Sequence, residues 1–425
     1  MTRFVWILLM LVCPFGLKAQ ISFDKYFEAR TLRIDFTLAG NDEQTELFLE
    51  QMKRQGEWAG SHTHLVDEEN YGNFRYQLRD PQSGEVLFSR GFCSLFQEWQ
   101  TTPEAATLSR SYYHVALMPF PKKKVKFVVE MRTWEGVFKE LLNLEVKPND
   151  YFIVDEKGAG YPVIPVMENG PHAEKVDLVF LAEGYQADEM DKFQQDIKRL
   201  TDYLFAMKPY DKHKQDFNLY AVLVPSAESG TDVPGKGVYK NTAFNSNFYT
   251  FDEARYLTSK DLKAIHDAAS GAVYDQLYVL VNSDTYGGGG FYNYLNLTTV
   301  DNERSPQVFV HEFGHGFAGL ADEYYSSSVA YDEFYNRKVE PWEPNITTLV
   351  DFDRKWKSMI EADIPQPTPR VARYDGVVGL FEGGGYAEKG IYSPVMDCRM
   401  KTNEAPGFCP VCSRAIEKAI QSYSE

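Results

Sequence analysis

The sequence predicts a multidomain protein in which an antiparallel β-sandwich precedes an α/β domain. Three observations lead to this fold class: residues 31–146 alternate apolar and polar side chains, residues 147–171 are rich in Pro and Gly, and a continuous apolar run begins at Val176. A chain of 425 residues also exceeds what one hydrophobic core usually supports. We therefore expect a leader over residues 1–19, a sandwich domain over 20–148, a linker over 149–172 and the α/β domain over 173–425.

The N-terminal domain shows the period of two that half-buried strands require. Residues 32–38 and 125–131 alternate in this way, and the Asp-Pro-Gln-Ser-Gly segment at residues 80–84 separates two apolar runs as a hairpin turn does. No catalytic constellation is visible in this domain. Short antiparallel strands with such turns predict a β-sandwich.

The period changes in the C-terminal domain. Apolar runs at residues 176–182, 217–224 and 276–281 predict buried strands, and residues 187–207 place apolar side chains on one helical face. Strands that alternate with helices in this way predict an α/β domain.

The first residues predict export. Arg3 precedes an apolar run over residues 4–17, and the following small residue suits cleavage before Gln20. The run is shorter than the roughly 20 residues of a spanning helix, so a transmembrane anchor is not expected. A secreted or periplasmic protein is the prediction, and a lipoprotein attached through Cys13 is the less favoured interpretation.

The charge excludes one class of partner. The formal net charge of −17 becomes −19 when the leader takes Arg3 and Lys18 with it, and no basic run offsets this excess of acid. The composition therefore argues against a nucleic-acid-binding protein.

A metal-dependent catalytic site is predicted by one segment, His311-Glu312-Phe313-Gly314-His315. Ser305-Pro306 has the form of a helix N-cap and first residue, so the motif is expected on a helix. Residues four apart share a helical face, and His311 and His315 can therefore bind one Zn²⁺ ion while Glu312 lies beside it. A third protein ligand would complete the set, and Glu312 would act as the general base for an attacking water.

A glycine-rich run at residues 286–290 follows the predicted strand at 276–281, and no Lys-Ser/Thr pair makes it a phosphate loop. Two interpretations stay open. The glycines could let a substrate backbone approach and pair as an added strand, or the run could be a flexible loop.

Four cysteines remain after leader removal, and three of them are close in sequence. In an oxidising compartment we expect a disulfide between Cys398 and either Cys409 or Cys412, with Cys93 left as a buried thiol. A redox site at the Cys-Pro-Val-Cys segment lacks the βαβ context that it needs. A zinc knuckle would need a fourth ligand, and no histidine follows His315.

With these residues in view, the sequence resembles the M64 family of peptidases, which is named for an immunoglobulin A peptidase. The resemblance covers the chain from Asp177 onward, and the preceding β-rich region resembles the N-terminal domain of many members. The segments that carry it are Leu-Ala-Glu-Gly-Tyr at 181–185, Pro-Ser-Ala-Glu-Ser-Gly at 225–230, Tyr-Gly-Gly-Gly-Gly at 286–290, the motif at 311–315, Gly-Leu-Ala-Asp-Glu-Tyr at 319–324 and Phe-Cys-Pro-Val-Cys at 408–412.

The resemblance implies a metzincin-like zinc peptidase, with a twisted five-stranded sheet, an active-site helix and a Met-containing turn beneath the metal. Met400 is the candidate for that turn and Met396 is the alternative. Both would otherwise pack in the core. The family name does not identify the substrate of this chain, because related chains can cut different proteins.

The third zinc ligand is expected to be Asp322. Metzincins that use a third histidine place it about ten residues after the first, and Ala321 occupies that position here. Gly319 can end the helix and turn the chain back toward the metal. The spacing from the histidine motif to Asp322 is one residue longer than in the usual pattern. Glu323 is therefore the alternative third ligand, and Glu333 is a weaker third choice. Asp322 could also serve only to accept a hydrogen bond from a loop amide.

The leading functional hypothesis is a zinc-dependent endopeptidase that acts on a protein or peptide substrate, with a host-derived protein as one option. Two alternatives come from other classes. One is a zinc-dependent amidase or deacetylase on cell-wall material, and the other is a surface binding module with a structural zinc.

Overall fold

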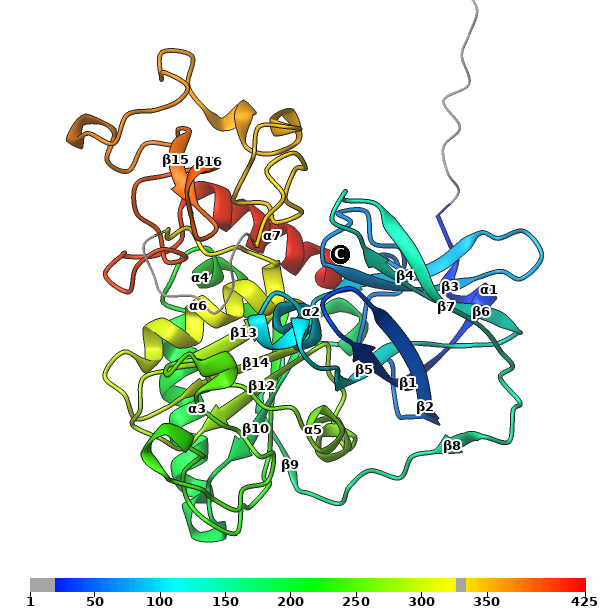
Figure 1. The fold of residues 1–425 in the computed structure, drawn as a ribbon. Coiled ribbons are helices and arrows are strands. Elements are labelled where there is room, and N and C mark those ends of the chain that lie inside the picture. Colours follow the sequence, from blue (N-terminus) through cyan, green and yellow to red (C-terminus); the bar gives the residue numbers. More distant parts are fainter. Residues whose placement is uncertain (1–19, 326–333) are drawn as a thin grey trace, which may run out of the picture.

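The computed structural model describes residues 20–325 and 334–425. Figure 1 shows two parts packed against each other: an all-β region formed by the N-terminal strands, and a mixed α/β domain that carries most of the helices. The predicted leader at 1–19 lies outside the described residues. Within the described ranges, no helix is long and apolar enough to cross a membrane.

The N-terminal region is the predicted sandwich, made of two four-stranded sheets whose strands are antiparallel except for β8, which pairs with β2 in the parallel sense. One sheet has the strand order β5-β1-β2-β8 and the other the order β4-β3-β6-β7. The strands are β1 (Phe27–Gly40), β2 (Thr45–Arg54), β3 (Phe74–Arg79), β4 (Val86–Phe92), β5 (Arg110–Pro121), β6 (Val125–Arg132), β7 (Phe138–Val146) and β8 (Ile153–Asp155).

Local chemistry explains these strands. The alternating apolar side chains of β1 and β6 are buried and meet in one core between the sheets. At the predicted hairpin, the Asp80 carboxylate accepts hydrogen bonds from the backbone amides of Gln82 and Ser83, which is the Asx geometry that stabilises tight turns. Two short helices, α1 (Phe23–Tyr26) and α2 (Leu95–Gln100), complete the region.

The stretch between the domains contains two short strands. β8 pairs with β2 in the sandwich, whereas β9 (Val163–Met167) joins the sheet of the second domain. Figure 1 shows this connection as a long coil on the outside of the molecule, with the short strand β8 within it. The Pro- and Gly-rich segment is therefore attached to both domains at its ends.

The second domain is built on a six-stranded sheet with the order β13-β14-β12-β10-β11-β9. The four inner strands are parallel and the two edge strands antiparallel. The expected sheet has five strands. The sixth is β9, whose Pro165 lacks an amide hydrogen and is tolerated because this strand lies at the edge. The others are β10 (Val176–Glu183), β11 (Phe217–Val222), β12 (Gln276–Val281), β13 (Gly288–Phe291) and β14 (Leu295–Thr299).

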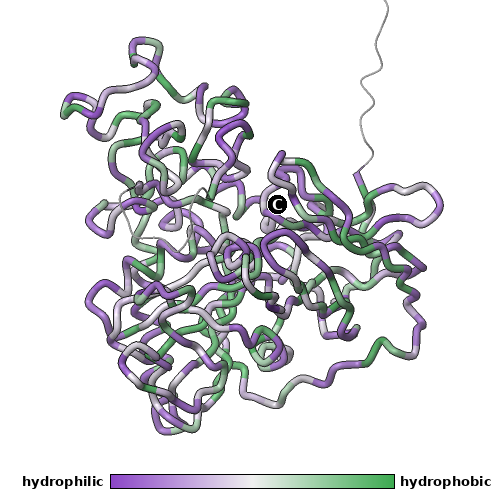
Figure 2. Tube along the Cα trace, viewed as in Figure 1, coloured by the Kyte–Doolittle hydropathy of each residue, from purple (hydrophilic) through white to green (hydrophobic). Residues whose placement is uncertain are grey.

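Both faces of this sheet are covered, which explains the continuous apolar runs in its strands. Along β10, Leu178 and Phe180 contact the core beneath the helices, while Val179 and Leu181 contact the core that continues into the sandwich. Figure 2 shows the hydrophobic segments in the interior and hydrophilic ones along the outer loops. The helices are α3 (Met190–Leu204), α4 (Tyr210–His213), α5 (Leu262–Ala269), α6 (Ser305–Ala318) and α7 (Pro410–Ser424).

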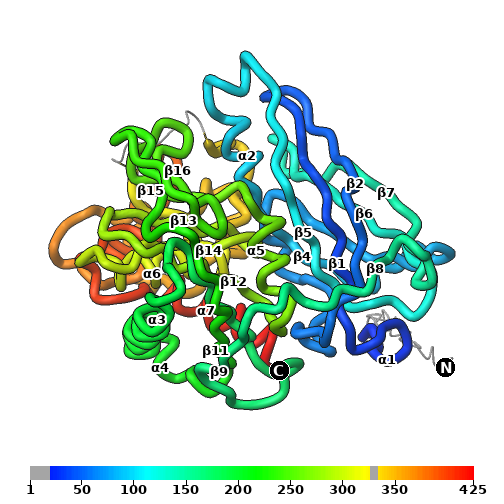
Figure 3. Tube along the Cα trace, turned by 90° about the horizontal axis from the view of Figure 1, so that it is seen from below, coloured from blue at the N-terminus to red at the C-terminus, as the bar shows by residue number. Residues whose placement is uncertain are grey.

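Viewed from below, the sandwich and the α/β domain lie side by side, with α2 and α5 near their boundary (Figure 3). Polar contacts fix this arrangement: Lys53 of β2 and Arg33 of β1 both lie 2.8 Å from the Asp267 carboxylate of α5. A hairpin of β15 (Phe381–Gly384) and β16 (Ala387–Ser393) precedes α7.

Candidate metal centre in the interdomain cleft

Helix α6 carries the two motif histidines. It begins at Ser305 with Pro306 as its second residue, and Arg304 occupies the N-cap, one residue before the predicted position. Gly319 ends the helix in the left-handed conformation, with φ of 63°, and its amide donates to the His315 carbonyl at 3.0 Å. This turn brings the following residues back alongside the helix.

The two imidazole rings are oriented by backbone carbonyls. The Nδ1 atom of His311 lies 2.9 Å from the Arg399 oxygen, and that of His315 lies 2.5 Å from the Leu320 oxygen. A neutral ring that donates through Nδ1 keeps a free lone pair on Nε2. The two Nε2 atoms lie 3.0 Å apart and face the same point.

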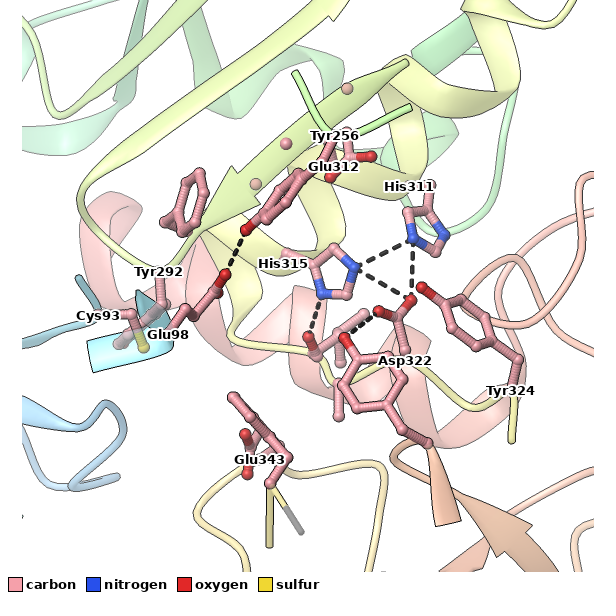
Figure 4. Close-up of a pocket in the computed structure, with 18 of the residues that line it drawn as sticks. Cys93, Glu98, Tyr256, Tyr292, His311, Glu312, His315, Asp322, Tyr324 and Glu343 are labelled. Carbon is pink, nitrogen blue, oxygen red and sulfur yellow. Dashed lines mark hydrogen bonds and ion pairs between the residues drawn. The ribbon is translucent and has the colours of Figure 1, made fainter. Parts of the chain in front are cut away.

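Asp322 completes the group. Its Oδ1 atom lies 3.1 Å from Nε2 of His311 and 3.3 Å from Nε2 of His315 (Figure 4). Among the described residues this buried oxygen has no hydrogen-bond partner, while the other oxygen accepts from the Tyr386 hydroxyl at 2.6 Å. Three hydrogen-bond acceptor atoms therefore converge on one point, where a bound cation would satisfy all of them.

The spacing of these atoms fits zinc. Ligand atoms bonded to tetrahedral Zn²⁺ at about 2.0–2.1 Å lie roughly 3.3 Å from one another. The three measured separations are 3.0, 3.1 and 3.3 Å. Two imidazoles and one carboxylate are a donor set that suits this ion and leave one position for water or substrate.

The electrostatics of the group also favour a positive charge at its centre. Burial lowers the pKa of His315, but the Asp322 carboxylate outweighs it and raises that pKa to about 9. In the opposite sense, burial raises the pKa of Asp322, but the two histidines hold it well below its ordinary value. A proton and a metal ion would compete for the same lone pairs.

Glu312 lies beside this group. Its carboxylate comes within 4.8 Å of the ligand atoms of both histidines. Burial raises the pKa of Glu312, which suits a general base near neutral pH. The space that it occupies depends on Gly288, because a Cβ atom there would lie 2.9 Å from Oε1 of Glu312.

Three of the four glycines of the glycine-rich run belong to β13 (Gly288–Phe291), an edge strand of the sheet. Its glycines allow close packing on both sides: a Cβ at Gly290 would lie 2.2 Å from the Glu312 carbonyl, and one at Gly289 would lie 2.7 Å from the Leu257 carbonyl. Tyr256 forms an isolated bridge with Gly288. A substrate strand added at this edge would meet that segment of the chain.

A cleft of about 430 Å³ opens onto the three converging atoms. Both domains line it. The α/β domain contributes the motif, the glycine strand and Lys401, and the sandwich contributes residues around α2, including Asn73 and Glu98. Active sites are often found at such domain boundaries.

Glu98 is a residue of the site that the sequence analysis does not predict. It accepts a hydrogen bond from the Tyr256 hydroxyl across the domain boundary (Figure 4). Burial raises the pKa of Glu98 to about 7, although the Tyr256 hydrogen bond acts in the opposite direction. Nothing in the local sequence of the sandwich marks this residue, because its position depends on how the domains pack.

The predicted disulfide is not present. Cys93, Cys398, Cys409 and Cys412 are all free thiols, and the Sγ atoms of Cys398 and Cys412 lie 3.8 Å apart, well beyond the roughly 2.05 Å of a disulfide bond. Cys93 is half-buried at the cleft. The three C-terminal cysteines instead surround Glu323, whose Oε1 atom lies 3.2 Å from Sγ of Cys412.

Glu323 therefore lies in a different group from the two histidines, although it was the alternative third ligand. Consecutive side chains of the chain point to two clusters, Asp322 to the histidines and Glu323 to the cysteines. Glu333, the weaker third choice, lies outside the described residues.

Met400 lies beneath the motif helix. It is fully buried, and its sulfur lies 2.8 Å from the point that a Cβ atom of Gly314 would occupy. Its carbonyl accepts the amide of Glu323 at 2.8 Å. Met396 is only half-buried.

Comparison with known families gives two matches that do not overlap. The family model described as IgA Peptidase M64 matches residues 164–373 and 370–420. The model described as Peptidase M64 N-terminus matches residues 22–143. No curated protein matches the chain.

Proposed function

Because this chain belongs to the IgA peptidase M64 family, and is therefore a peptidase, we propose that it is an exported, zinc-dependent endopeptidase. The observation that carries the proposal is the convergence of His311, His315 and Asp322 on one point of the interdomain cleft. These three residues would hold the ion. When bound, zinc would supply a Lewis acid and lower the pKa of water toward about 7.

The other residues have separate tasks. Glu312 takes the proton of the attacking water and passes it to the leaving amine, because its carboxyl is close to the histidines and its pKa is raised by burial. Arg399 and Leu320 hold the rings through their carbonyls. Tyr386 holds the Asp322 carboxylate. Such supporting contacts set the orientation of metal ligands.

The substrate in this proposal is a protein or peptide, and a host-derived protein is one option. The cleft is partly open to solvent and lined by residues of both domains, which suits a peptide chain as the substrate. Secretion or delivery to the periplasm rests on the predicted leader at residues 1–19.

The site argues against a surface module with a structural zinc. A structural zinc is closed by four protein ligands, whereas the group of His311, His315 and Asp322 borders a cleft of about 430 Å³ that can admit water or a substrate. An amidase or deacetylase would use the same ion and the same base, so only the substrate distinguishes this alternative from a peptidase.

Digestion with a chelator control tests the proposal. The purified protein should cut components of a protein mixture, with new termini mapped by mass spectrometry, and the cuts should vanish with a chelator and return with added zinc. Cuts that persist without metal would overturn the zinc assignment. Release of amines or acetate from cell-wall material, with no new peptide termini, would replace the peptidase by the amidase or deacetylase.

A further inference from the structure

A second cluster of ligand atoms lies behind the proposed catalytic centre. Glu323, Cys398, Cys409 and Cys412 are all buried, and their ligand atoms lie within 4.8 Å of one another. The cluster joins three parts of the chain: the turn after α6, the turn that contains Met400, and the start of α7.

From this geometry we infer that Glu323, Cys398, Cys409 and Cys412 form a closed structural zinc site. Thiolates bonded to tetrahedral zinc at about 2.3 Å lie roughly 3.8 Å apart, and the Sγ atoms of Cys398 and Cys412 are separated by 3.8 Å. Three cysteines and one carboxylate give the four ligands that a closed site needs. This inference does not depend on the proposed peptidase activity.

The backbone around the thiols supports the same conclusion. The amide of Cys409 lies 3.3 Å from Sγ of Cys398, and the amide of Cys412 lies 3.4 Å from Sγ of Cys409. Cys409 is also the N-cap of α7, where the positive end of the helix dipole favours a negative charge. Amide donors and a helix N-terminus both stabilise thiolates, the form that binds metal.

Glu323 gives an independent indication of a ligand. Its side chain has no exposed surface, and among the described residues its Oε2 atom has no hydrogen-bond partner. Its other oxygen accepts a hydrogen bond from the side-chain amide of Asn345 at 3.0 Å and contacts Sγ of Cys412. A buried carboxylate oxygen without a partner is costly, and a bound cation would satisfy it.

The location of this cluster indicates a structural role for a bound metal. The amide of Glu323 donates to the Met400 carbonyl, and the neighbouring Arg399 carbonyl accepts from His311. A metal that ties Glu323 to Cys398 would fix both segments at once. The site would thus position Asp322 and His311, and its ligands are positioning residues and not catalytic ones.

Metal content of the full chain is the test. The wild type should carry about two zinc ions, a His311→Ala/His315→Ala variant about one, and Cys409→Ser or Glu323→Gln about one. Cys93→Ser, which removes a cysteine outside the cluster, should keep about two.

Cobalt substitution covers the case in which a cysteine variant fails to fold. The His311→Ala/His315→Ala variant loaded with Co²⁺ should show a thiolate-to-cobalt charge-transfer band. Absence of that band, or a disulfide among Cys398, Cys409 and Cys412 in an unreduced peptide map, would overturn the inference. A wild-type protein without peptidase activity, together with a histidine variant that still shows this band, would contradict the proposed function alone.

Discussion

The packing of α6 on the glycine strand makes a specific prediction for Gly290→Ala. The new Cβ atom would lie 2.2 Å from the Glu312 carbonyl, more than 1 Å inside ordinary contact. Gly290 has a backbone conformation that alanine can adopt, since it is not among the residues with positive φ. The strand and helix must therefore separate by about 1 Å, and a misplacement of that size costs roughly 100-fold in rate.

The assay compares kcat/KM on a peptide substrate with thermal stability. Overpacking should also destabilise the fold by about 1–3 kcal/mol, so activity is measured well below the unfolding temperature. Gly56→Ala is the matched control, because a Cβ at Gly56 meets nothing within 4 Å. A folded Gly290→Ala protein with nearly full activity would refute the role assigned to this contact.

Two further predictions concern the proposed ligand set and the domain boundary. Asp322→Ala should abolish binding of the zinc held by the histidines. Tyr386→Phe should lower the affinity for that zinc by about 10–100-fold, because the variant loses the hydrogen bond to the Asp322 carboxylate. A metal titration that shows unchanged affinity in both variants would contradict the assignment. Burial raises the pKa of Asp267, but Lys263 and Lys53 outweigh it and lower that pKa to about 2. Its contribution to stability, up to about 2 kcal/mol, is present above pH 4 and is lost as the pH falls toward 2. Asp267→Asn should show a smaller loss of stability over that interval in denaturant titrations, and an identical loss would contradict it.

Much of the fold could be predicted from local pattern. The apolar runs predicted as strands match β10, β11 and β12, and the helical face predicted over residues 187–207 contains α3. These elements have strong periodicity and are buried on their apolar sides, so the signal is local. The edge strand β9 was missed because its segment contains Pro165 and shows no alternation.

The candidate site could also be predicted only in part, because some of its contacts are local in sequence and others are not. Helical spacing was enough to bring His311 and His315 together, and Gly319 signalled the turn that returns Asp322. The contribution of Glu98 could not be predicted, since it depends on the packing of two domains. The sequence predicts a disulfide for the cysteine cluster because the fourth member of the cluster, Glu323, is distant in sequence and is not a histidine.

The proposed peptidase chemistry depends most on Glu312, and one measurement tests the role of this residue directly. Zinc content and peptidase rate are measured together for Glu312→Gln and for Glu303→Gln, an exposed glutamate just before α6. Glu312→Gln should keep its zinc and its fold but lose nearly all activity, because the carboxylate is the base and not a ligand, while Glu303→Gln should match the wild type. A Glu312→Gln protein that kept zinc and most of the peptidase rate would contradict the account.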